Sequence, residues 1–129
     1  MYGVGLLANE RYMPQLSTEE VLLQAHERIG RARSAFAGMD YLCSGTLLKR
    51  MMKCGKASCA CQTDPAARHG PYYEWGHMKD GKLVHRYVSP EQAKVLDQAI
   101  ANYRNVQKLL RTWETETERV LDAQYPRKR

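Results

Sequence analysis

The sequence predicts an α+β protein in which two helices, the C-terminal one long, surround a small antiparallel β-sheet or hairpin with a zinc-stapled loop. Three observations support this prediction. Two segments carry apolar residues at alternating spacings of three and four positions. Between them, β-favouring residues flank an Asp-Gly pair, and three cysteines fall within eight positions. The length of 129 residues favours one domain, residues 1–129.

Residues 1–16 form an N-terminal arm in this prediction. The arm lacks a basic segment followed by a long apolar one, so we expect no signal peptide. No apolar run approaches the roughly 18 residues that span a bilayer, so we expect no membrane contact. We therefore expect a cytoplasmic protein, where thiols stay reduced and clustered cysteines bind metal more often than they form disulfides.

The first helix is expected over residues 17–39. Ser17 and Glu20 have the spacing of a capping box, and Gly38 is a residue that commonly ends a helix. The apolar residues in between lie on one stripe, and they are Leu22, Ala25, Ile29, Ala32, Phe36 and Met39.

Residues 43–88 are expected to hold a strand, a cysteine-rich metal loop and a β-hairpin. The strand is predicted over 43–53 and leads directly into the loop. Asp80 and Gly81 are typical of a type I′ turn, which sets Met78 opposite Leu83. The same turn sets Trp75 opposite Arg86.

Alternation along the hairpin sends Tyr73 and Trp75 to one face and Tyr72 and Glu74 to the other. One face must meet the core. We therefore expect at least half of these aromatic residues to pack against the long helix, although an aromatic platform for nucleic-acid bases is the alternative.

The long helix is expected over residues 89–123, followed by a basic tail at 124–129. Ser89, Pro90 and Gln92 form a strong start signal. Spacings of three and four continue from Leu96 to Val120 and indicate coiled-coil-like packing, either against the first helix or against a second copy. We predict a homodimer whose interface contains Tyr103, Val106, Leu110 and Trp113.

The cysteines follow the pattern C-x4-C-x-C, and a histidine comes after seven more residues. Thiolate sulfur and imidazole nitrogen suit tetrahedral zinc, so the predicted ligands are Cys54, Cys59, Cys61 and His69. The fourth ligand is open, and the competitors are His77, His85, Asp64 and Cys43. An iron–sulfur cluster and metal-free reduced cysteines are the alternatives to zinc.

The loop itself argues for a structural metal. Residues 54–71 contain four alanines as their only apolar residues besides the cysteines, so the segment has little to bury against its chain entropy. A structural zinc contributes on the order of 10 kcal/mol in small zinc peptides. Cys59 or Cys61 acting as a nucleophile with His69 is the enzymatic alternative, but thiols one residue apart fit ligands better. We therefore expect no enzyme.

Positive charge concentrates around the cysteines. The net charge is +6 and the isoelectric point about 9.3, a balance that favours an anionic partner such as DNA or RNA. No acid occurs between Asp40 and Asp64. The predicted nucleic-acid-binding residues are Lys49, Arg50, Lys53, Lys56, Lys82 and Arg86.

The segments CGKASCAC and HGPYYEW, the hairpin ending in YVS and the long helix after it together resemble an uncharacterised family of small bacterial proteins. Its members carry a CGK-x-x-C-x-C…HGPY motif and are often encoded near transposase-type genes in mobile elements. The resemblance covers roughly residues 43–110. It implies a metal site and a nucleic-acid context, favours His69 as the fourth ligand and implies no catalytic role.

Taken together, the sequence predicts a non-enzymatic zinc-binding accessory protein that associates with nucleic acid beside a recombinase or nuclease of a mobile element or defence system. The alternative is a protein–protein interaction or dimerisation module that docks on a larger enzyme without touching nucleic acid.

Overall fold

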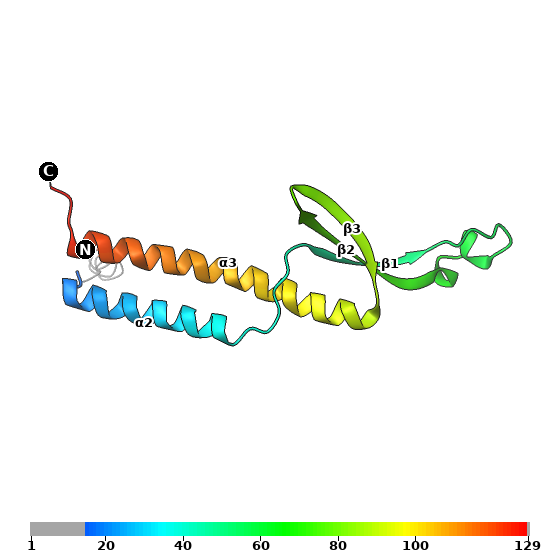
Figure 1. Cartoon of the computed structure of the whole chain (residues 1–129). Helices are drawn as coiled ribbons and strands as arrows, with labels where there is room; N and C mark the ends of the chain where they lie inside the picture. The colour runs from blue at the N-terminus through cyan, green and yellow to red at the C-terminus, as the bar shows by residue number, and fades with distance from the viewer. Residues whose placement is uncertain (1–14, 129) are drawn as a thin grey trace, which may run out of the picture. The chain divides into compact units, whose positions relative to one another are not determined.

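The computed structural model describes residues 15–128, so residues 1–14 of the predicted arm and the last residue of the predicted tail lie outside the described part. The elements follow in the order α2 (Thr18–Ala37), β1 (Thr46–Met52), η1 (Ala60–Gln62), η2 (Pro65–Ala67), β2 (His69–Lys79), β3 (Lys82–Val88) and α3 (Pro90–Gln124) (Figure 1). Within the described residues, two helices and a three-stranded antiparallel sheet confirm the α+β prediction. Neither helix contains an apolar stretch long enough to cross a membrane.

The chain divides into two compact units. Of the described residues, one unit contains 15–34 and 110–128, and the other contains 35–109. The first unit is a helical hairpin and the second holds the sheet, the cysteine loop and the first part of α3. The expectation of a single domain stays a prediction.

Both helices begin at the predicted capping residues. The Ser17 hydroxyl accepts the backbone N–H of Glu20 at 3.1 Å, and the Glu20 carboxylate accepts the Ser17 hydroxyl at 3.2 Å. At α3, Ser89 accepts the backbone N–H of Gln92 at 3.0 Å while Gln92 accepts the backbone N–H of Ser89 at 2.9 Å. Each cap satisfies backbone donors that have no partner within the helix.

In the helical unit, α2 packs antiparallel to the C-terminal part of α3. Ala25 and Ala32 are the buried residues of α2, and their small side chains let the helices approach closely. The Thr18 hydroxyl donates to the backbone oxygen of Ala123, and this bond links the start of α2 to the end of α3. The residue spacing predicted that the long helix packs either against the first helix or against a second copy, and the structure shows the packing against the first helix.

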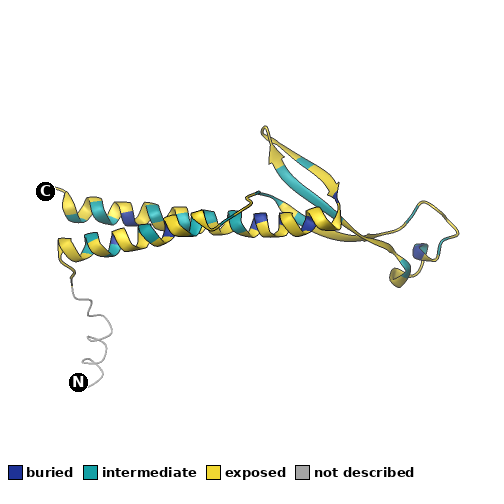
Figure 2. Ribbon diagram, turned by 60° about the horizontal axis from the view of Figure 1, so that its bottom comes forward, coloured by how far each residue is buried: buried dark blue, intermediate teal, exposed yellow. Residues whose placement is uncertain are grey.

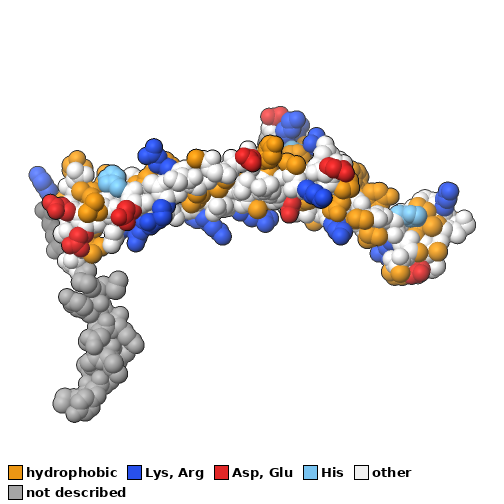
Figure 3. All heavy atoms as spheres, turned by 90° about the horizontal axis from the view of Figure 1, so that it is seen from below, with side chains coloured by type: hydrophobic (Ala, Val, Ile, Leu, Met, Phe, Trp, Pro, Cys, Tyr) orange, Lys and Arg blue, Asp and Glu red, His pale blue; other side chains and the backbone are white. Residues whose placement is uncertain are grey.

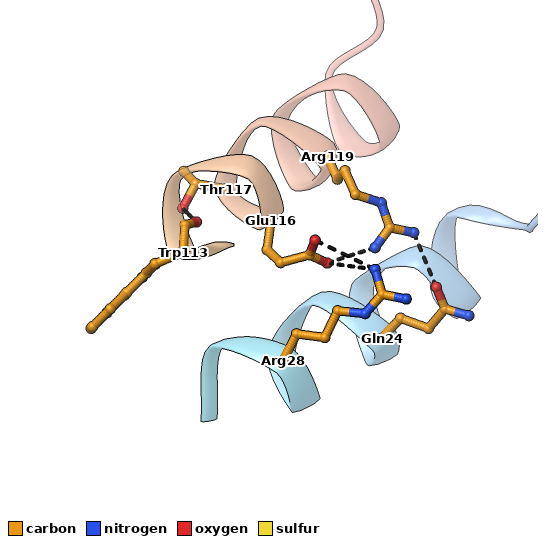
Figure 4. A network of polar contacts seen from close by, with 6 residues as sticks. All are labelled: Gln24, Arg28, Trp113, Glu116, Thr117 and Arg119. Atoms are coloured by element: carbon orange, nitrogen blue, oxygen red, sulfur yellow. Dashed lines mark hydrogen bonds and ion pairs between the residues drawn. The ribbon is translucent and has the colours of Figure 1, made fainter. Parts of the chain in front are cut away.

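Glu116 is the buried charge of this unit, with 3% of its surface exposed (Figure 4). Its carboxylate lies 2.6 Å from the guanidinium of Arg119 and 3.4 Å from that of Arg28 on α2. Arg119 also donates to the side chain of Gln24 at 3.0 Å. Because two arginines neutralise the carboxylate, its burial is tolerated and the network links the two helices.

The inward-facing stripe of α3 differs from the predicted one in its second half. Leu109 is half-buried and Glu116 is buried, whereas Leu110 and Thr117 are exposed. Steps of three and four alternate along the helix, and the sequence does not say which comes first after Val106. The structure takes the step of three, so Leu110 lies outside the stripe that packs within the chain, and its place in a dimer interface stays a prediction.

The sheet has the order β1-β2-β3, with both pairs antiparallel. Met78 pairs with Leu83 and Trp75 with Arg86, as the turn position predicted. Asp80 has a φ of 52° and Gly81 a φ of 78°, so both central residues have the positive φ that a type I′ turn requires.

A small core lies between one face of the sheet and the start of α3. Its buried residues are Val88, Ala93, Leu96 and Ile100, and the partly buried residues packed against them are Cys43, Leu47, Tyr73 and Trp75. Buried positions recur along α3, and much of the sheet surface is exposed (Figure 2). The Trp75 indole donates to the backbone oxygen of Ser44 at 3.1 Å. Tyr73 and Trp75 are therefore packing residues, which confirms the expectation for this face.

Candidate metal centre

The pairing of β1 with β2 brings the two ends of the cysteine loop together. Met52, at the end of β1, pairs with His69, at the start of β2. Cys54 follows Met52 by two positions, so the strand register alone places it near the histidine. The loop between these strands lies at one end of the sheet (Figure 1).

A β-bulge sets this register. Arg50 pairs with Tyr72, but Met52 pairs with His69, so β2 has one more residue than β1 across this interval. Gly70 lies in the bulge with a φ of 136°, and the Gly70–Pro71 peptide is cis. A Cβ atom on Gly70 would lie 2.8 Å from the backbone oxygen of Arg50, so only glycine fits. This explains why glycine follows histidine in the HGPY segment.

The structure brings together the four predicted ligands. The Sγ atoms of Cys54, Cys59 and Cys61 and a ring nitrogen of His69 all lie within 4.8 Å of one another. Cys61 Sγ is 3.5 Å from Cys54 Sγ, and Cys59 Sγ is 3.4 Å from His69 Nε2. Cys61 is buried, Cys54 and Cys59 are half-buried, and His69 is exposed. Such a cluster can hold a metal ion.

Backbone donors make one of these thiols acidic. The backbone N–H of Cys61, followed by the side chain of His69, lowers the pKa of Cys59 from an ordinary 9.0 to about 6. At Cys61 the backbone N–H of Cys54 donates to the sulfur at 3.3 Å and lowers the pKa, but burial and the neighbouring thiols together raise it. The lowered pKa of Cys59 favours the thiolate, the form in which cysteine binds metal.

Gln62 holds the loop together, although the sequence patterns did not single it out. Its side-chain amide donates to the backbone oxygen of Cys54 at 2.7 Å and to that of Lys56 at 3.2 Å. These bonds tie the start of the loop to η1, which carries Cys61. The only signal in the sequence is that a residue with two amide donors directly follows the last cysteine.

The competitors for the fourth ligand position have other partners. His77 stacks on Trp75 with ring centroids 3.6 Å apart. His85 Nδ1 lies 3.3 Å from the carboxylate of Glu74. Asp64 accepts the backbone N–H of Ala66 and so caps η2. Cys43 packs against the core instead.

The structure distributes the predicted nucleic-acid-binding residues over several surfaces. Lys49 and Arg86 pair with Tyr73 and Trp75, so they share the face of the sheet that meets α3. Arg50 lies on the opposite face. Lys53 and Lys56 belong to the loop, and Lys82 is at the Asp80-Gly81 turn. Lys and Arg side chains are visible at the loop and beside the sheet (Figure 3).

Of the four predicted interface residues of α3, three are half-buried within the chain, and they are Tyr103, Val106 and Trp113. Leu110 is 46% exposed. An apolar side chain so placed is available to a partner.

A family description, a domain of unknown function called DUF6788, matches residues 19–98. The chain belongs to the DUF6788 family. The match contains the whole Cys3His cluster and all three strands, and it also includes most of α2. The resemblance drawn from the motifs began near residue 43, so DUF6788 extends further toward the N-terminus and ends within α3. Neither a curated protein nor a solved structure matches the chain.

Proposed function

We propose that this member of DUF6788 is a zinc-stabilised accessory protein that binds nucleic acid and catalyses no reaction. The observation that carries the proposal is the Cys3His cluster at the end of a positively charged sheet. Between residues 46 and 88 there are eight Lys and Arg residues and three acids, a net charge of +5 of the chain's +6.

Zinc is the metal that best fits this donor set. Metal–sulfur bonds of about 2.3 Å and metal–nitrogen bonds of about 2.0 Å in a tetrahedron separate the ligand atoms by roughly 3.5–3.8 Å. The contacts of 3.4 and 3.5 Å lie near this range, and the remaining separations, none above 4.8 Å, would shorten on binding. Bound zinc would hold the loop closed.

A structural role follows from the number of ligands. Four protein ligands complete the tetrahedron and leave no position for a water molecule or a substrate, which a catalytic zinc needs. The metal would then stabilise the loop, and the basic residues beside it would contact phosphates.

The zinc proposal is tested by metal analysis of protein purified without added metal. We expect close to one zinc per chain, with loss of zinc and a lower melting temperature for Cys59→Ser. Cys43→Ser is the matched control, because Cys43 lies in the core and should leave the zinc content unchanged. A zinc-free protein that melts as the zinc-containing one does would contradict the proposal.

The nucleic-acid proposal is tested by the salt dependence of binding to labelled duplex DNA, duplex RNA and single strands. Each phosphate contact adds about 0.9 to the slope of log affinity against log salt on duplex DNA. Replacing Lys49, Arg50, Lys53 and Lys56 by Gln should flatten that slope by up to about 3.6 units if all four contact phosphates. A control with the same change in charge replaces four exposed residues of α3, namely Lys94, Arg104, Lys108 and Arg111.

An absence of binding at low salt would assign the basic residues to a protein interface. The second candidate function, a dimerisation or docking module, would then apply, and exposed Leu110 favours it. Purification of the protein from cells with its partners would test the association with a recombinase or nuclease.

A further inference from the structure

One face of the sheet carries an exposed pair of tyrosines that packing does not explain. Leu47, Tyr73, Trp75 and Val88 belong to the face that meets α3. Side chains alternate along each strand, so their neighbours point to the other face, which we call the open face. Its residues are Leu48, Arg50, Met52, Tyr72, Glu74, Met78, Leu83, His85 and Tyr87.

The two tyrosines are neighbours on adjacent strands. Their ring centroids are 6.4 Å apart with an interplanar angle of 69°, and Tyr87 directs its hydroxyl toward Met52 Sδ at 3.8 Å. Tyr72 is 45% exposed and Tyr87 is 59% exposed. Together with Met52 they line an apolar hollow at the end of the open face nearest the metal loop.

The charges around this hollow favour an anion. Arg50 pairs with Tyr72 across the sheet, and half of its side chain is exposed. The one acid of the open face, Glu74, lies 3.8 Å from Arg50 and 3.3 Å from His85, and 15% of its side chain is exposed. Its charge is therefore already opposed by Arg50, while Lys53 and Lys56 follow in the loop.

We propose that the open face binds single-stranded nucleic acid by stacking unpaired bases on Tyr72 and Tyr87, with Arg50 contacting the phosphate backbone. Exposed aromatic rings beside basic residues are the common means of holding single strands, and a base inside a duplex offers no free face because its neighbours stack on both sides. The inference rests on the proposed function and adds to it the strand type and the stacking residues.

The test compares two strands that have the same phosphates. One is a 20-nucleotide oligothymidine and the other is a 20-unit abasic strand, each titrated against the full-length, zinc-loaded protein. Loss of one stacked base corresponds to about a 5- to 150-fold loss of affinity. We expect the wild-type protein to bind oligothymidine at least tenfold more tightly than the abasic strand.

Variants then locate the stacking. Tyr72→Leu with Tyr87→Leu should weaken oligothymidine binding by about tenfold or more, with the salt slope and abasic binding unchanged. Tyr72→Phe with Tyr87→Phe should retain the affinity, because a phenyl ring still stacks. The matched control is Tyr41→Leu with Tyr125→Leu, since both tyrosines are exposed and lie outside the sheet.

Each contrary outcome has a distinct meaning. Equal affinity of the wild-type protein for both strands would overturn the stacking inference while leaving phosphate binding intact. Failure to bind any nucleic acid would overturn the proposed function as well. A dimer that becomes a monomer only in the Leu variant, as measured by sedimentation, would make the open face an interface between copies and would also overturn the inference. The comparison on wild-type protein needs no variant, so it stands even if the Leu variant misfolds.

Discussion

Replacing Gly70 by alanine should separate the backbone geometry of the bulge from the chemistry of the ligands. Gly70 is adjacent to His69 but contributes no ligand atom. Its φ of 136° is a conformation that residues with a side chain rarely adopt, at a cost of roughly 1–3 kcal/mol. A Cβ atom there would also lie 2.8 Å from the backbone oxygen of Arg50. Because that neighbour is backbone, a side-chain rotation cannot relieve the overlap.

The expected cost is therefore at least about 2 kcal/mol, which is about thirtyfold in an equilibrium constant. If zinc orders the loop, the metal-free loop can relax and the cost lowers the affinity for zinc. Competition against a chromophoric chelator measures this affinity, and thermal unfolding in saturating zinc measures any part of the cost that remains.

Gly55→Ala is the matched control, because Gly55 lies in the same loop and a Cβ there would have nothing within 4 Å. Its zinc affinity should stay within about threefold of the wild type. Equal zinc affinities and equal melting temperatures for the two alanine variants would refute the argument that the bulge positions His69.

Three further predictions concern pH and the helices. Acidification should weaken zinc binding, because protons compete with the metal for the thiolates and the imidazole. The lowered pKa of Cys59 delays this competition at that thiol until the pH falls below about 6. An apparent zinc affinity that stays constant between pH 7 and pH 5 in a chelator titration would disagree. Leu110→Asp should convert the predicted dimer into a monomer in sedimentation at tens of micromolar, whereas Leu83→Asp, an exposed position on the hairpin, should leave the dimer intact. A wild-type protein that is itself a monomer would exclude this interface. Glu116→Gln should destabilise the helical hairpin by about 1–3 kcal/mol, seen as a lower melting temperature, because Arg28 and Arg119 lose their carboxylate partner. The control Glu114→Gln changes an exposed residue and should leave the melting temperature unchanged.

The features that the sequence predicted correctly are those with local causes. Ser17, Ser89 and the Asp80-Gly81 pair interact with residues at most three or four positions away. The helix starts and the hairpin register could therefore be derived from short stretches of sequence. The cysteine pattern likewise predicted which thiols come together, since short spacings leave a loop few ways to arrange them.

The remainder depends on residues far apart in the chain. Glu116 stands in a run of acids and threonines that looks fully solvated, and its burial follows from Arg28, 88 positions away. The bulge at Gly70 requires the approach of Arg50 on another strand. Which face of the sheet stays open depends on where α3 packs, and no single strand encodes that.

The strand pair at the base of the metal loop also makes the loop a transferable unit. Its two ends, Met52 and His69, are already partners in an antiparallel ladder, and three of the four ligands lie between them while the fourth is His69 itself. Residues 52–71 therefore contain the ligands, the bulge and the glycine in one continuous segment. If the loop binds zinc as we propose, this segment grafted in place of the turn of an unrelated hairpin should close when the metal binds, in the register of its host.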